Sequence, residues 1–234
     1  ARIGAVVNTH ANGDHTFGNQ LVEGARIIAS KACAEDMALR PPEQYAGWQK
    51  DWPNMGIAGR FWNEVMGSRF DFSGIRLVRP NETFSGDLTL RVGDKEVRLL
   101  EVGPAHTRGD TLVHLPDERI VFSGDILFIE GTPIVWAGPI SRWIAACDRI
   151  LGLDAEVIVP GHGPLTDSRG VTRVREYLAY VDVEAAARYR AGMNVEEAAR
   201  DIALGQFTTL RERERIVVNV EAKYRELRGG DERA

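Results

Sequence analysis

Hydrophobic positions along this chain alternate between short β-branched runs and longer stretches with helical spacing. Apolar runs at residues 3–8 and 25–29 predict buried strands with a short helical turn between them, around Gly18 and Asn19. Glycine, proline and aspartate pairs typical of turns separate a second series of strands, predicted at residues 75–78, 88–92, 97–102, 111–115, 120–123 and 157–159. This pattern predicts at least one sheet built mainly from hairpins.

Helical spacing appears between these strands and dominates the end of the chain. Ser30 is a suitable N-cap for a helix that runs to about Leu39, and the prolines that follow stop it. After Pro164 the composition shifts toward charged helices, one of which starts at a capping box. Further helices are predicted over 140–151, 171–191, from Asn194 with Glu197, and over 211–227. Mixed strands and helices predict an α/β fold with a helical C-terminal extension.

Residues 43–72 crowd aromatic side chains into a segment without strand periodicity, which predicts a helical excursion. The aromatic residues are Tyr45, Trp48, Trp52, Phe61, Trp62, Phe70 and Phe72. One interpretation is a satellite hydrophobic cluster under a long connection. A second, compatible with the first, is a lid or wall for an apolar substrate, with Trp48, Trp52 and Trp62 in contact with it.

Composition narrows the class of protein. With 44% hydrophobic and 27% charged residues the chain is typical of a globular protein. A net charge of -5 without any basic run argues against nucleic-acid binding. Cys33 and Cys147 are too few for a disulfide framework and are predicted to be buried thiols. Neither a signal peptide nor a membrane span is visible, so we expect a cytoplasmic protein that does not act at a membrane.

The candidate chemistry lies in the loops. Four of the five histidines occur in short loops marked by glycine or proline, together with two aspartates. Imidazole nitrogen and carboxylate oxygen are ligands for zinc and similar divalent ions. The candidate metal ligands are therefore His10, Asp14, His15, His106, Asp125 and His162. The fifth histidine, His114, lies in a predicted strand and is expected to be structural.

The order of these six residues resembles the metallo-β-lactamase superfamily, whose motifs are His-x-His-x-Asp-His, a lone His, a lone Asp and a late Gly-His. The resemblance extends over residues 3–165. It implies an αββα sandwich: a metal-binding core over residues 1–167, including the segment 43–72 as a lid, and a helical extension over 168–234. Family members have several strands before the first motif, and we expect these N-terminal strands to be missing from this sequence.

The resemblance also implies how the ligands divide. His10 and His106 would belong to a first metal site, Asp14, His15 and His162 to a second, and Asp125 would bridge them. Asn12 stands where the family has its second histidine, and an amide oxygen is a poorer zinc donor than imidazole. The hypothesis is one or two zinc ions per chain, with a tight second site and a first site that is weak or filled by manganese or iron.

The expected reaction is attack of metal-activated hydroxide on an acyl carbon, with a small-molecule or carrier-protein-tethered thioester or ester as substrate. Asp14 would orient the nucleophile, and Asn12 would donate its amide to the developing oxyanion. Arg108 and Trp136 are further candidates for the substrate pocket.

Two alternatives stay open at this point. The stretch from Val6 to His15 is similar to the cyclase–thioesterases of aromatic polyketide pathways, which act on a carrier-tethered polyketide. The other alternative is a non-catalytic, metal-stabilised binding protein that kept the fold. A homodimer is compatible with all of these.

Overall fold

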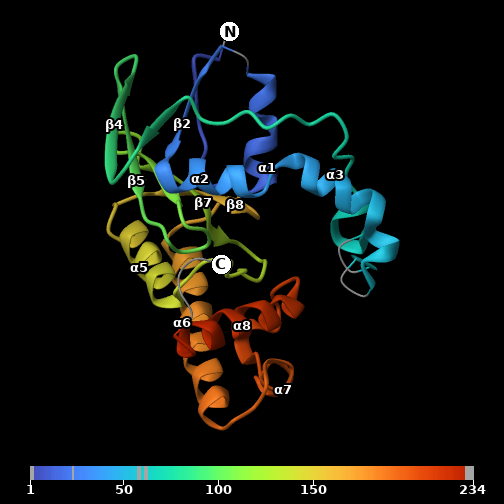
Figure 1. The fold of residues 1–234 in the computed structure, drawn as a ribbon. Helices are drawn as coiled ribbons and strands as arrows, with labels where there is room; N and C mark the ends of the chain where they lie inside the picture. The colour runs from blue at the N-terminus through green and yellow to red at the C-terminus, as the bar shows by residue number, and fades with distance from the viewer. Residues whose placement is uncertain (1–2, 23, 57–58, 61–62, 230–234) are drawn as a thin grey trace. The chain divides into compact units, whose positions relative to one another are not determined.

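The computed structural model describes residues 3–22, 24–56, 59–60 and 63–229 and divides into two compact units, Ala1–Thr83 and Phe84–Ala234 (Figure 1). Each unit contains its own sheet and its own apolar cluster.

The first unit is built on a three-stranded sheet of order β1-β2-β3, in which β1 and β2 are parallel. Ser30 caps α2 as predicted, because its hydroxyl accepts a hydrogen bond from Cys33 N at 3.1 Å. Most of the described part of the aromatic segment, up to Gly67, is helical, as predicted. The elements are β1 (Ala5–Val7), α1 (Gly13–Thr16), η1 (Phe17–Leu21), β2 (Arg26–Ser30), α2 (Lys31–Leu39), α3 (Pro42–Asp51), η2 (Trp52–Asn54), η3 (Asn63–Gly67) and β3 (Glu82–Phe84).

The prediction of a strand at residues 75–78 is wrong. This stretch has no sheet partner and precedes the short β3. Its backbone is bonded by side chains instead: Gln20 Oε1 accepts from Arg76 N at 3.0 Å, and Asn19 Nδ2 donates to Val78 O at 3.0 Å. Side chains of η1 therefore satisfy backbone groups that a neighbouring strand would otherwise have paired.

The second unit contains a five-stranded sheet of order β4-β5-β6-β7-β8. Neighbours are antiparallel up to β7, and β8 runs parallel to β7 after the crossover helix α5. The predicted turn at Gly93 and Asp94 joins β4 to β5. The elements are β4 (Asp87–Val92), β5 (Lys95–Glu101), β6 (Thr111–Leu115), β7 (Ile120–Phe128), α5 (Ile140–Leu151) and β8 (Val157–His162).

Two strands run further than predicted. β7 continues past Ser123 to Phe128 because Ile126, Leu127 and Phe128 are all buried in the core. Its pairing with β8 shifts register around Gly124, and β8 extends to His162, which pairs with Phe128. Asp125 and His162 therefore lie within irregular strand ends and not in loops.

The C-terminal region is helical, as predicted, and consists of α6 (Ser168–Arg190), α7 (Val195–Asp201) and α8 (Ile216–Leu227). The capping box of Asn194 and Glu197 is confirmed, since each side chain bonds the other's backbone at 3.0 Å. α8 starts later than the predicted residue 211, after Glu212 adopts a left-handed φ of 56°. The functional division into a core over 1–167 and an extension over 168–234 stays a prediction.

No helix within the described ranges has the length and apolar character needed to cross a membrane.

Candidate metal centre

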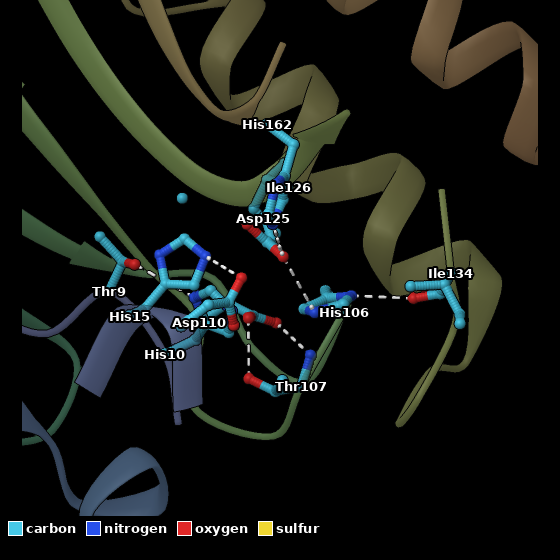
Figure 2. A network of polar contacts seen from close by, with 12 residues as sticks. Thr9, His10, His15, His106, Thr107, Asp110, Asp125, Ile126, Ile134 and His162 are labelled. Carbon is cyan, nitrogen blue, oxygen red and sulfur yellow. Dashed lines mark hydrogen bonds and ion pairs between the residues drawn. The ribbon is translucent and has the colours of Figure 1, made fainter. Parts of the chain in front are cut away.

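In the second unit, three of the predicted ligands converge at the ends of β7 and β8. Asp125 Oδ2 lies 3.4 Å from His106 Nε2 and 3.3 Å from His162 Nε2 (Figure 2). The side chains of His106 and Asp125 are 0% and 2% exposed, whereas that of His162 is 47% exposed. One face of this cluster is therefore anchored in the core, and the other is accessible through His162.

The His106 ring is held from several sides. Its Nδ1 lies 2.8 Å from the carbonyl oxygen of Ile134. The Trp143 ring packs edge-on against it with centroids 5.5 Å apart, and Phe128 lies at the same distance. Phe128 in turn stacks on His162 with an interplanar angle of 14°.

The turn that carries His106 depends on Asp110, which was not among the residues predicted for the site. The buried Asp110 carboxylate accepts hydrogen bonds from both the backbone N and the hydroxyl of Thr107, each at 2.8 Å (Figure 2). These two bonds fix the chain directly after His106. The signal available in the sequence was an aspartate four residues after the histidine in a glycine-bearing turn.

In the first unit, His10, Asp14 and His15 lie around α1. The His10 and His15 rings have centroids 4.3 Å apart, and Asp14 Oδ2 lies 3.3 Å from His15 Nε2. Thr9 Oγ1 lies 3.1 Å from His10 Nδ1. The predicted motif thus places two imidazoles and a carboxylate together at the end of β1.

A pair of buried asparagines, which the sequence reading did not identify, orients this turn. Asn8 and Asn19 exchange amide hydrogen bonds of 3.0 and 2.9 Å. Asn8 Nδ2 also lies 3.2 Å from His15 O, to which it donates. A closed pair of this kind fixes the direction in which β1 enters the motif, because both amides are buried and satisfied.

Comparison with known families identifies the family to which this pattern of histidines and aspartates belongs. The family model described as the metallo-beta-lactamase superfamily matches residues 1–162. The chain belongs to the metallo-β-lactamase superfamily. It has the α/β fold of that superfamily, with two sheets and a C-terminal helical region.

Several members of the superfamily are measurably similar. Acyl-coenzyme A thioesterase MBLAC2 of Homo sapiens is 26% identical over 162 residues, covering 67% of this chain and 54% of the relative. Hydroxyacylglutathione hydrolase of Methylococcus capsulatus is 27% identical over 159 residues, covering 68% and 47%. The sec-alkylsulfatase Pisa1 from Pseudomonas sp. matches in structure with a TM-score of 0.69 and 16% identity, covering 99% and 42%. The chain spans about half the length of the curated relatives it matches.

The geometry of His106 fits the metal that the superfamily implies. A carbonyl oxygen only accepts hydrogen bonds, so the short contact with Ile134 places the ring proton on Nδ1. In the neutral ring, Nε2 then carries a lone pair that faces a carboxylate oxygen at 3.4 Å. Two acceptors at this distance repel each other unless a cation lies near both, and metal-binding histidines commonly donate their other nitrogen to a carbonyl.

The residues predicted for the substrate pocket lie in both units. Trp48 lies on α3 and Trp52 at the start of η2, both partly buried, while Trp62 lies outside the described residues. Trp136 is 38% exposed, and its backbone N donates to His106 O at 3.2 Å, so it is adjacent to the His106 turn. Arg108 is partly buried in the turn that follows His106.

His114 lies in β6, opposite Arg98 and away from the ligand cluster. Burial lowers the pKa of His114 below its ordinary value of 6.5, with the nearby Arg98 acting in the same direction and Glu96 opposing it. The expectation that His114 is structural agrees with this position in the sheet.

The backbone at Gly161 allows Asp125 to lie where it does. A Cβ at Gly161 would be 1.9 Å from Asp125 Oδ1 and 2.8 Å from Gly124 C. We expect Gly161→Ala to push the carboxylate out of line and to weaken zinc binding by about a hundredfold, the size of effect seen when a ligand loses its orientation. Titration of zinc into the metal-free protein measures this. Gly18→Ala is the control, because a Cβ there meets nothing within 4 Å; equal affinity in both variants would contradict the prediction.

Proposed function

We propose that this chain is a metal-dependent hydrolase of acyl thioesters. The observation that carries the proposal is the His106–Asp125–His162 cluster, in which a buried carboxylate oxygen faces the Nε2 atoms of two imidazoles at 3.4 and 3.3 Å. The choice of thioesters is supported by the acyl-coenzyme A thioesterases and the hydroxyacylglutathione hydrolase among its relatives.

In this proposal, the ligands divide as the superfamily's pattern implies: His10 and His106 would belong to the first metal site, Asp14, His15 and His162 to the second, and Asp125 to both. Each site offers nitrogen and oxygen donors of the kind that zinc takes, with one or two ions per chain. At the first site, where Asn12 replaces the family's second histidine, manganese or iron is the alternative to zinc. When bound, such an ion lowers the pKa of a water molecule and polarises a carbonyl group.

The protein's own residues would orient the reactants. The Asp14 side chain is 54% exposed and lies beside His15, so solvent reaches the carboxylate that would orient an attacking water. Asn12 is the N-cap residue of α1, and its backbone carbonyl is fixed by His15 N and Thr16 Oγ1, both at 3.0 Å. A fixed backbone reduces the freedom that the Asn12 side chain would lose if its amide donated to an acyl oxygen.

An apolar acyl group would be recognised by aromatic rings in the first unit. Tyr45 packs against Phe17, Trp48 and Phe72, with ring centroids 5.4, 5.5 and 5.5 Å apart. Phe17 directly follows α1, which carries Asp14. Burial raises the pKa of Tyr45, Arg40 lowers it and the charge of Asp14 raises it further. The aromatic cluster and the acidic ligand are thus neighbours within one unit.

The test is metal content by elemental mass spectrometry, paired with hydrolysis of palmitoyl-coenzyme A and S-lactoylglutathione. We expect bound transition metal, thioester cleavage, and loss of at least about 99% of the rate after chelation, because the metal contributes several kcal/mol and 1.36 kcal/mol is tenfold in rate. Activity should return when zinc is added back.

Two results would contradict the proposal. Faster cleavage of a secondary alkyl sulfate than of either thioester would indicate a sulfatase, the activity in the name of one structurally similar protein. Bound metal with no hydrolysis of any ester would favour the non-catalytic binding protein. The polyketide cyclase hypothesis stays a prediction from the sequence, and a carrier-tethered polyketide thioester is its own test substrate.

A further inference from the structure

The loop from Thr132 to Trp136, which follows β7, determines how His106 is held. Ile134 O accepts the proton of His106 Nδ1 at 2.8 Å (Figure 2). In return, the backbone N atoms of Trp136 and Ala137 donate to His106 O at 3.2 and 3.1 Å. The ring and the backbone of His106 are therefore both fixed by this one loop.

The loop is fixed in turn by Asn219, a fully buried residue in the first turn of α8. Asn219 Oδ1 accepts from Val135 N at 2.9 Å, and Nδ2 donates to Pro133 O at 2.9 Å. These two groups lie on either side of Ile134. Because the peptide groups before and after Ile134 are both bonded to one amide, the Ile134 carbonyl has little freedom to rotate away from His106.

Other residues of the C-terminal region also form hydrogen bonds with the 132–136 loop. Arg215 Nη1 donates to Thr132 O at 2.9 Å, and Arg225 Nη2 donates to Trp136 O at 3.1 Å. Thr132 Oγ1 also donates to Arg211 O at 2.7 Å. The carbonyls on both sides of Ile134 are thus bonded to the C-terminal helical region, and the Ile134 carbonyl is bonded to the metal-ligand histidine.

We propose that Asn219 is a positioning residue for the metal centre, which fixes the proton of His106 on Nδ1 and its lone pair on Nε2 through the 132–136 loop. The inference rests on the proposed function in that His106 is taken as a metal ligand. It gives the C-terminal helices a part in the chemistry, although they contain none of the six predicted ligands.

The environment of Asn219 offers a matched control. Its Nδ2 also lies 3.1 Å from the hydroxyl of Tyr177 on α6, which accepts its second proton. Burial raises the pKa of Tyr177 to about 12, so the hydroxyl is neutral at pH 7. Tyr177→Phe removes one hydrogen bond from the same buried amide but leaves both bonds to the loop in place.

The experiment compares Asn219→Leu with Tyr177→Phe by two readouts. Long-range ¹⁵N–¹H NMR of the metal-free proteins reports which nitrogen of His106 carries the proton. Calorimetric titration with Zn²⁺ reports affinity. We expect Asn219→Leu to give a mixture of His106 tautomers and a 10- to 100-fold loss of zinc affinity, as for other groups that orient metal ligands. Tyr177→Phe should keep the tautomer and the affinity within about twofold, because its loop bonds are intact.

An unchanged tautomer and unchanged zinc affinity in Asn219→Leu would overturn the inference, as would an equal loss in Tyr177→Phe. If Asn219→Leu does not fold, Asn219→Asp replaces it under the same criteria, since an ionised carboxylate still accepts from Val135 but cannot donate to Pro133. The NMR readout needs neither metal nor substrate. A wild-type protein with the Nδ1 proton and bound zinc but no thioesterase activity would therefore refute the proposed function and leave this inference supported.

Discussion

Asp125→Asn is expected to lower kcat/KM for thioester hydrolysis by about a thousandfold, or about 4 kcal/mol of transition-state stabilisation. The Asp125 Oδ2 atom lies within 3.4 Å of both His106 and His162, so its charge acts on an ion held by either imidazole. An amide keeps the shape of the side chain but removes that charge. Steady-state kinetics with palmitoyl-coenzyme A, together with metal content, would measure both parts of the effect.

The same substitution, which lowers activity, should leave the stability of the metal-free protein unchanged or raise it. A carboxylate that is 2% exposed is costly to bury unless a cation compensates its charge. Metal-free Asp125→Asn should therefore unfold at the same or a higher denaturant concentration than wild type, while zinc should stabilise only the wild type. Asp94→Asn, in the exposed β4–β5 turn, is the control and should change neither property. Lower stability of the metal-free variant would point to a structural role for Asp125.

Trp143→Ala should lower the free energy of unfolding by about 3–5 kcal/mol, the range for removal of a large buried aromatic ring. The Trp143 side chain is 0% exposed, and its Nε1 donates to Ile126 O at 3.0 Å, directly after Asp125 in β7. It also packs edge-on against His106. Trp143 therefore joins α5 to the strand that carries the candidate ligand Asp125, and it supports the ring of the candidate ligand His106.

Urea denaturation measures this effect, with the slope of the transition as a check that the same cooperative unit unfolds. Trp143→Phe should lose about 1–3 kcal/mol, because it leaves the buried Ile126 carbonyl without its donor. Leu151→Ala, at the exposed end of the same helix, should stay within about 0.5 kcal/mol of wild type. A loss below about 1 kcal/mol in Trp143→Ala would contradict the packing argument.

The sequence predicted those parts of the structure that depend on neighbouring residues. The Ser30 cap, the Asn194 capping box and helix α5 are set by local pattern, and each lies where it was expected. The candidate ligand residues were recognisable because their order along the chain is characteristic of the superfamily. Within the second unit, Asp125 lies 3.4 Å from His106 and 3.3 Å from His162, and the assignment of all six residues as ligands stays a prediction.

The features that were missed depend on distant partners or on irregular backbone. Asn219 bonds a loop 84 residues earlier, and no local pattern distinguishes it from any other helical asparagine. Gly124 suggested the end of a strand, yet β7 continues through a shift in register because buried residues follow it. The extended stretch at 75–78 has strand-like residues, but side chains from η1 take the place of a sheet partner.

The burial of both cysteines has a practical consequence for the thioesterase assay. Cys33 and Cys147 are each 0% exposed and outside any disulfide, and burial raises the pKa of Cys147 to about 12. The thiolate is the form that reacts with colorimetric disulfide reagents. The folded chain should therefore add almost no signal when released coenzyme A is counted with such a reagent. A slow rise toward two thiols per chain would instead report unfolding, so one reagent can follow both turnover and the integrity of the protein.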